Sequence, residues 1–155
     1  MAEARDNSGV RFPPPLLYVV GLLAGWLLER EYPLTSLPHN FAIAAGIVLV
    51  LAGAALSRSG ARAVWKANSS IVPIRPTTAI ATDGVFRFTR NPMYVGLLVI
   101  YAGTALLIRS PWAFILLPLV ILAVDRLVIA KEERYLARKF GEQYLSYKNR
   151  VRRWI

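Results

Sequence analysis

The chain has 155 residues, of which 55% are hydrophobic and 18% are charged, yet its 19 Lys and Arg against 9 Asp and Glu give a formal net charge of +10. A chain of this length is typical of one domain, and so apolar a composition excludes an intrinsically disordered protein. The absence of cysteine excludes disulfides, cysteine-based zinc sites and thiol nucleophiles, and the single histidine, His39, leaves no candidate transition-metal site.

Four stretches without a charged residue are predicted to be membrane-spanning helices. They cover residues 12–28, 37–56, 92–108 and 111–124. A span needs about 20 apolar residues, so flanking residues must contribute, and the last stretch is expected to continue past Asp125 and Arg126 to Ala130. None shows the polar stripe of a helix in a soluble bundle. The predicted fold class is therefore an all-α integral membrane protein with about four transmembrane helices.

The positions of the basic residues predict the orientation. An even number of spans places both termini on one side; if that side is cytoplasmic, 17 of the 19 basic residues are cytoplasmic and only Arg30 and Arg109 lie outside. Membrane proteins show this bias of Lys and Arg toward cytoplasmic loops, so the net charge requires no nucleic-acid partner. The basic tail at residues 148–153 is a candidate for contact with anionic lipid head groups.

The chain is predicted to have two parts. Residues 1–56 form an N-terminal transmembrane hairpin that serves as scaffold, and residues 57–155 hold a polar cytoplasmic loop, a second hairpin and the basic tail. The small residues of the first part that permit close helix approach are Gly21, Gly25, Ala42 and Gly46. The second hairpin turns at Arg109-Ser110, so its two helices are expected to lie antiparallel and in contact.

Charged and aromatic residues are expected to meet at the cytoplasmic end of the second hairpin. Tyr94 and Arg126 are each 16 residues from the hairpin tip, which is roughly 24 Å along a helix, so both lie at one level. Glu132 and Glu133 lie about 9 to 10 Å further out. Residues seven apart share a helix face, so Asp125 is expected to align with Glu132. On the same argument Arg126 aligns with Glu133, and a pocket is predicted here.

Simpler explanations exist for the same residues. Asn91 is a good helix N-cap, Pro92 suits a first helical turn, and Asp83-Gly84 is an ordinary turn. The chain has no glycine-rich phosphate loop and no Ser-His-Asp set. The predicted pocket therefore suits a cationic or zwitterionic small molecule held by the glutamates, or a lipid head group.

The motifs around this pocket resemble those of the isoprenylcysteine carboxyl methyltransferase family and of related phospholipid methyltransferases. The family motif Arg-His-Pro-x-Tyr-x-Gly is similar to residues 90–96, which read Arg-Asn-Pro-Met-Tyr-Val-Gly. The family's later Glu-Glu and Phe-Gly-x-x-Tyr-x-x-Tyr elements are matched by residues 132–133 and 140–147. One departure is Asn91 in place of the family's histidine, because asparagine forms hydrogen bonds but is no acid or base near pH 7.

The resemblance implies a membrane methyltransferase that uses S-adenosylmethionine and releases S-adenosylhomocysteine at the cytosolic face of a bacterial or archaeal cytoplasmic membrane. The implied acceptor is a lipophilic molecule or lipid, with the carboxylate of an isoprenylcysteine-like molecule as the first candidate and a phospholipid amine as the alternative. The oligomeric state stays open. The cofactor-binding residues that the resemblance implies are Thr78, Ala79, Ile80, Ala81, Phe86, Asn91, Pro92, Met93, Tyr94 and Glu132.

Three further residues are candidates for the catalytic chemistry. Methyl transfer from a sulfonium to a carboxylate requires alignment and exclusion of water but no general base, and Arg126 is the candidate to orient an anionic acceptor, unless it is a snorkelling interfacial arginine. Arg90 is expected to support the helix start or the substrate. An amine acceptor requires a proton acceptor, for which Glu133 is the candidate. A non-catalytic membrane adaptor or small transporter remains the alternative of another class, although the spans lack the buried charge typical of transporters.

Overall fold

The computed structural model describes residues 7–10, 12–34, 38–70 and 77–155, and these contain helices but no strand. The helices are α1 (Pro15–Glu31), α2 (His39–Lys66), α3 (Pro92–Leu107), α4 (Pro111–Val124), α5 (Ala130–Phe140) and α6 (Glu142–Arg150), together with the 3-10 helix η1 (Gly84–Arg87) and the π-helix η2 (Asp125–Ile129). The predicted all-helical class is confirmed for this part of the chain. The first residue of the second apolar stretch and residues 71–76 of the cytoplasmic loop lie outside it.

Two helices are long and apolar enough to cross a membrane. One is His39–Lys66, with 28 residues, and the other is Pro111–Phe140, a continuous rod of 30 residues made of α4, η2 and α5. At about 1.5 Å per residue both exceed the roughly 30 Å of a hydrocarbon core. The helix α3 is apolar but has only 16 residues. The expected continuation of the fourth stretch past Asp125 is thus observed in the rod.

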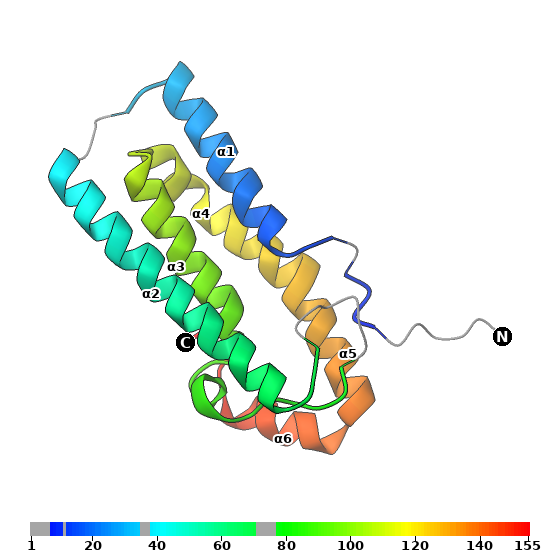
Figure 1. The fold of residues 1–155 in the computed structure, drawn as a ribbon. Helices are drawn as coiled ribbons and strands as arrows, with labels where there is room; N and C mark the ends of the chain where they lie inside the picture. Colours follow the sequence, from blue (N-terminus) through cyan, green and yellow to red (C-terminus); the bar gives the residue numbers. More distant parts are fainter. Residues whose placement is uncertain (1–6, 11, 35–37, 71–76) are drawn as a thin grey trace.

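The bundle pairs the N-terminal helices with the C-terminal hairpin. Helix α1 packs mainly on α4, and α2 packs along α3, so the two N-terminal helices lie on opposite sides of the hairpin (Figure 1). The small residues of the N-terminal part do allow close helix approach: a Cβ at Gly25 would meet the backbone of Ala113 on α4, and one at Gly46 would meet Gly103 on α3.

The turn between α3 and α4 is as short as the sequence predicted, and the two helices are antiparallel and in contact. Arg109 adopts a positive φ of 53°, and Ser110 caps α4 by accepting a hydrogen bond from the Ala113 amide. The buried Ser110 hydroxyl also donates to the Gly25 carbonyl at 2.9 Å. The tip of the hairpin is thereby fixed to α1.

At the opposite end of the bundle, α6 crosses below α2 and α3 and closes a second core (Figure 1). Val64 of α2, Phe86 of η1 and the α6 residues Tyr144 and Tyr147 are buried in this core. The Tyr147 hydroxyl donates to the Phe86 carbonyl at 2.8 Å. These contacts place η1, the start of α3 and α5 around one space, where the candidate site lies.

Candidate functional site

One cavity lies at the end of the bundle where α2, α3, α5 and α6 meet. It measures about 860 Å³ when the space open to solvent is included. Most residues that the sequence indicated for the site line it. They are Ala79, Ile80, Ala81, Phe86, Arg90, Asn91, Pro92, Met93, Tyr94, Glu132 and Glu133.

Two of the predicted residues do not line this cavity. The side chain of Thr78 is exposed and donates to the Asn68 carbonyl, although its neighbour Ala79 does reach the cavity. The Arg126 side chain is 75% exposed and lies 3.9 Å from the carboxylate of Asp125. The structure therefore places Arg126 outside the cavity and gives it the exposure expected of an interfacial arginine.

Tyr94 and Glu132 form the polar floor of the cavity. The Tyr94 hydroxyl donates to Oε1 of Glu132 at 2.9 Å, and the Tyr94 carbonyl accepts from the buried Tyr18 hydroxyl at 3.0 Å. Among the described residues, Tyr94 is the hydrogen-bond partner of Glu132. A carboxylate has about four acceptor positions, so Glu132 presents unused acceptor capacity to a ligand in the cavity.

At the start of α3, the polar side chains form other hydrogen bonds than those of the expected N-terminal cap. Pro92 occupies the first turn as predicted, but the Asn91 side chain makes no capping hydrogen bond. The side-chain NH₂ of Asn91 donates instead to the carbonyl of Arg153 at 2.9 Å. The backbone N–H of Asn91 donates to the Thr89 hydroxyl at 3.1 Å. The prediction of a simple asparagine cap was therefore wrong, and Asn91 joins α3 to the C-terminal end of the chain.

The π-helix η2 changes which side chains share a face of the long rod. An α-helix aligns residues seven apart, but a π-turn inserts one extra residue and moves the alignment to eight. The expected alignment of Asp125 with Glu132 is wrong for this reason. Asp125 aligns with Glu133, and the Arg153 guanidinium contacts both carboxylates. Glu132 points to Tyr94 instead.

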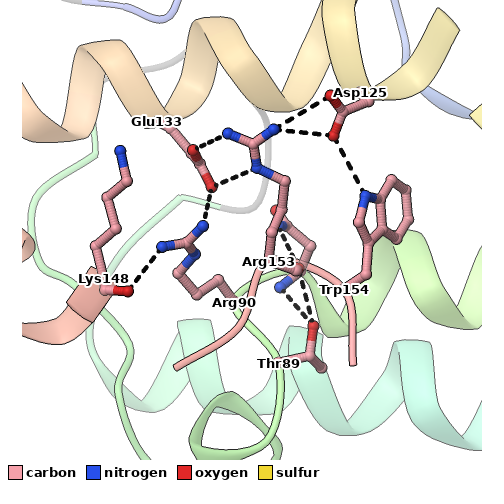
Figure 2. Close-up of polar contacts among 8 residues, drawn as sticks. Thr89, Arg90, Asp125, Glu133, Lys148, Arg153 and Trp154 are labelled. Atoms are coloured by element: carbon pink, nitrogen blue, oxygen red, sulfur yellow. Dashed lines mark hydrogen bonds and ion pairs between the residues drawn. The ribbon is translucent and has the colours of Figure 1, made fainter. Parts of the chain in front are cut away.

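Glu133 and Asp125 are connected by arginine side chains into one ion-pair network (Figure 2). Arg153 lies 2.6 Å from Oε2 of Glu133, its Nε donates to Oε1 at 3.1 Å, and its Nη1 lies 3.2 Å from both oxygens of Asp125. Hydrogen bonding to Glu133 raises the pKa of Arg153 above its usual value. Because both oxygens of Glu133 are bound by guanidinium groups, the geometry does not favour Glu133 as the proton acceptor that the sequence suggested.

Arg90 connects this network to the cavity. Its side chain is only 9% exposed; Nη2 pairs with Glu133 at 2.9 Å and Nη1 donates to the Lys148 carbonyl at 2.9 Å. Its Nε is buried without a hydrogen-bond partner among the described residues. A buried unsatisfied donor is costly, and this nitrogen is shielded from solvent within the ion-pair network that borders the cavity.

Several lining residues were not assigned a site role from the sequence. They are Val64, Ser69, Ser70, Thr77, Tyr135, Leu136, Tyr144 and Tyr147. The Tyr-x-x-Tyr spacing of α6 was the available signal for the last two, because both tyrosines then face one side of the helix. Burial raises the pKa of Tyr147 to about 12 and the pKa of Tyr144 further, so both phenols are neutral at physiological pH.

A second groove borders the cavity on its apolar side. It measures about 720 Å³ and lies between the start of α1, the end of α2 and the start of α3. Pro14, Pro15 and Leu97 give it an apolar surface, and Met93 and Tyr94 line both this groove and the cavity. The two spaces therefore share a wall at the start of α3.

Comparison with known proteins shows which sequences this chain resembles. Residues 41–143 match the model of a family described as phospholipid methyltransferase. The chain is also 28% identical over 108 residues to Protein-S-isoprenylcysteine O-methyltransferase B of Arabidopsis thaliana, covering 68% of this chain and 55% of that protein. Over 144 residues it is 29% identical to Protein-S-isoprenylcysteine O-methyltransferase of Rattus norvegicus, covering 88% of this chain and 50% of that protein.

The chain spans about half the length of these two relatives. A third relative, an uncharacterized protein of Haemophilus influenzae, is matched over its whole length, with 40% identity over 63 residues that make up 41% of this chain. The matches to the isoprenylcysteine methyltransferases and the family model confirm the resemblance that the motifs had indicated.

Proposed function

The chain belongs to the phospholipid methyltransferase family, and on that premise we propose that it is an integral membrane enzyme that transfers a methyl group from S-adenosylmethionine to a lipophilic acceptor. The observation that carries the proposal is the shared wall between the cavity and the apolar groove, at Met93 and Tyr94. A polar cofactor and an apolar acceptor could approach the same point from these two sides.

The side chains in the cavity match the chemical groups of the proposed cofactor. The cofactor has a sulfonium, an ammonium and a carboxylate, together with a flat adenine ring. The open acceptor positions of Glu132 suit the cationic groups, and the positive charge of Arg90, which lines the cavity, suits the carboxylate. Apolar contacts to the ring are available from Phe86, Ile80 and Leu136. When bound, the cofactor would supply an electrophilic methyl group, and the remaining contributions come from the chain itself.

The chain's own contribution is to align the two reactants and exclude water. Tyr94 is held at both ends, by Tyr18 at its carbonyl and by Glu132 at its hydroxyl, so the wall between the two spaces is fixed. A fixed geometry of this kind converts a bimolecular step into an effectively intramolecular one. The burial of Tyr94 and Pro92 keeps bulk water from the point where the spaces meet.

We propose that α1 and α3 cross the membrane together with the two candidate spans, which gives four transmembrane helices. The outward faces of α1, α2 and α4 expose large apolar side chains, among them Leu23 and Leu27 of α1, Leu51 of α2 and Leu119 of α4. Exposed apolar surface of this extent is typical of a lipid-facing bundle. With α1 and α3 also crossing, both termini and the cavity lie on the side that carries most basic residues, which we place in the cytosol of a bacterial or archaeal cell.

The acceptor class is proposed from the same geometry. A carboxylate acceptor needs no proton acceptor, which agrees with the engagement of Glu133 by Arg90 and Arg153. A phospholipid amine would need one. Both glutamates line the cavity, but the oxygens of Glu133 are bound by guanidinium groups, so Glu132 is the better candidate. An isoprenylcysteine-like carboxylate is therefore the first proposal and a phospholipid amine the second.

The experiment is a methyl-transfer assay with purified protein in phospholipid vesicles. S-adenosylmethionine labelled in its methyl group is incubated with prenylcysteine, aminophospholipid and thiol acceptors, and label is counted in the lipid-soluble fraction. Label transferred to a lipophilic acceptor by the wild-type chain, and lost with Glu132→Gln, supports the proposal. Absence of transfer to every acceptor, together with absence of cofactor binding by calorimetry, would favour the non-catalytic adaptor or transporter.

A further inference from the structure

The last five residues, Val151–Ile155, form an extended segment that crosses the start of α3 and the long rod; we call it the C-terminal strap. We propose that Arg153 of this strap is a positioning residue, which holds Glu133, Arg90 and Asn91 in the geometry that binds the cofactor. The inference rests on the proposed function. Arg153 is directed into the protein, so the expected contact of the basic tail with lipid head groups is left to its exposed members, such as Arg150 and Arg152.

The side chain of Arg153 fixes one side of the cavity. It bridges Glu133 and Asp125 across the π-turn, with separations of 2.6 Å and 3.2 Å. Glu133 in turn pairs with Arg90, which lines the cavity. The orientation of the Arg90 guanidinium therefore depends on a carboxylate that Arg153 also holds.

The backbone of Arg153 fixes the other side. Its carbonyl accepts from the Asn91 side chain at 2.9 Å and from the Thr89 hydroxyl at 3.2 Å. Trp154 adds a hydrogen bond from its indole N–H to Asp125 at 3.2 Å. One residue thus joins the start of α3 to the rod, and both elements line the cavity.

The charges of the network agree with a positioning role. Two carboxylates, Asp125 and Glu133, are bound by the guanidinium groups of Arg90 and Arg153. The exposed Arg126 also approaches Asp125 at 3.9 Å, so both carboxylates are compensated without a ligand. Glu133 is 7% exposed, and removing one partner of a buried pair leaves the other charge uncompensated. Loss of the Arg153 side chain leaves Glu133 with Arg90 alone, and the free edge of the carboxylate can then pull Arg90 away from the cavity.

The test measures binding of S-adenosylhomocysteine by calorimetry to the full chain in detergent micelles. We expect Arg153→Ala to raise the dissociation constant about tenfold, the size expected for loss of one charge-assisted contact. The matched control is Arg152→Ala, which removes the same charge from a neighbouring exposed side chain and should stay within about twofold of wild type. Arg153→Lys keeps the charge but not the fork that spans two carboxylates, and we expect an intermediate loss of about threefold.

A double-mutant cycle separates positioning from a general loss of stability. If Arg153 acts through Glu133, Arg153→Ala should weaken binding much less in a Glu133→Gln background than in wild type. Equal losses in both backgrounds, or full recovery with Arg153→Lys, would overturn the inference. If Arg153→Ala fails to fold, the lysine variant gives the same comparison. A wild-type chain that binds no cofactor refutes the proposed function, whereas wild-type binding with an unaffected Arg153→Ala refutes this inference alone.

Discussion

Replacing Glu132 by glutamine tests the polar floor of the cavity with a minimal change of shape. The glutamine side-chain oxygen can still accept the hydrogen bond that the Tyr94 hydroxyl donates at 2.9 Å, so the fold and the packing of Tyr94 are expected to persist. What disappears is the negative charge. If Glu132 holds a cationic group of the cofactor, the cofactor's dissociation constant should rise while the melting temperature changes little.

The size of the effect follows from the location of the carboxylate. Two unit charges about 4 Å apart interact by about 4 kcal/mol at the effective dielectric constant near a protein surface. Desolvation offsets part of this, and hydrogen bonds to charged groups contribute about 1.5–3 kcal/mol net. Glu132 is half-buried, so we expect a loss within that range. The corresponding rise in the dissociation constant is about tenfold to a hundredfold.

Calorimetric titration of the purified chain measures this effect, with Glu142→Gln as the matched control because Glu142 is exposed on α6. Titrating both S-adenosylmethionine and S-adenosylhomocysteine identifies the cationic group: loss for both ligands indicates the ammonium, and loss for the first alone indicates the sulfonium. If Glu132→Gln binds both ligands within about twofold of Glu142→Gln, the assignment of Glu132 to the cofactor is refuted.

Three further predictions concern packing, orientation and pH. A Cβ at Gly96 would lie 2.7 Å from a backbone carbonyl oxygen of α2, so Gly96→Val should destabilise the fold by about 1–3 kcal/mol, measured by denaturant unfolding against the exposed-site control Ala54→Val. The chain has no cysteine, so Leu34→Cys and Asn149→Cys should react with an impermeant maleimide from opposite sides of sealed vesicles; reaction from the same side would contradict the proposed topology. Burial raises the pKa of Tyr147 from 10 to about 12, so the fold favours the protonated phenol. This stabilisation should be present below pH 10 and disappear as the pH rises toward 12; a Tyr147→Phe variant with the same alkaline melting curve as wild type would contradict this.

The helices and the location of the site could be predicted because both depend on local sequence. Long apolar runs predict the rod and α2, and proline at the first helical turn predicts the start of α3. Counting residues along the hairpin placed Tyr94 level with Arg126, and Glu132 about 9 to 10 Å further out. The observed hydrogen bond from the Tyr94 hydroxyl reaches Glu132 across that offset.

It could not be predicted which side chains share a face of the long rod, because this depends on one backbone irregularity. The π-turn at Asp125–Ile129 has no proline or glycine to indicate it. An extra residue in one turn rotates everything that follows, and this is why Glu133, rather than Glu132, aligns with Asp125. The alignment expected from the sequence depended on an uninterrupted α-helix.

The contacts of the C-terminal strap could not be predicted either, for a different reason. Its contacts join residues more than 60 positions apart, such as the carbonyl of Arg153 with Asn91, and backbone carbonyls carry no sequence signal. A run of basic residues near a membrane resembles any solvated juxtamembrane segment. The pairing of α1 with α4 was missed similarly, because small residues permit close helix contact without specifying the partner.

The central claim, that this cavity binds the methyl donor beside an apolar entry for the acceptor, is tested most directly by an experimental structure of the chain with S-adenosylhomocysteine. We predict that the ligand lies between Glu132 and the start of α3, with a cationic group at the carboxylate of Glu132 and its own carboxylate near the guanidinium of Arg90. The position of its sulfur is predicted to be beside Met93 and Tyr94. A ligand bound elsewhere, or a cavity that stays empty at saturating ligand, would contradict it.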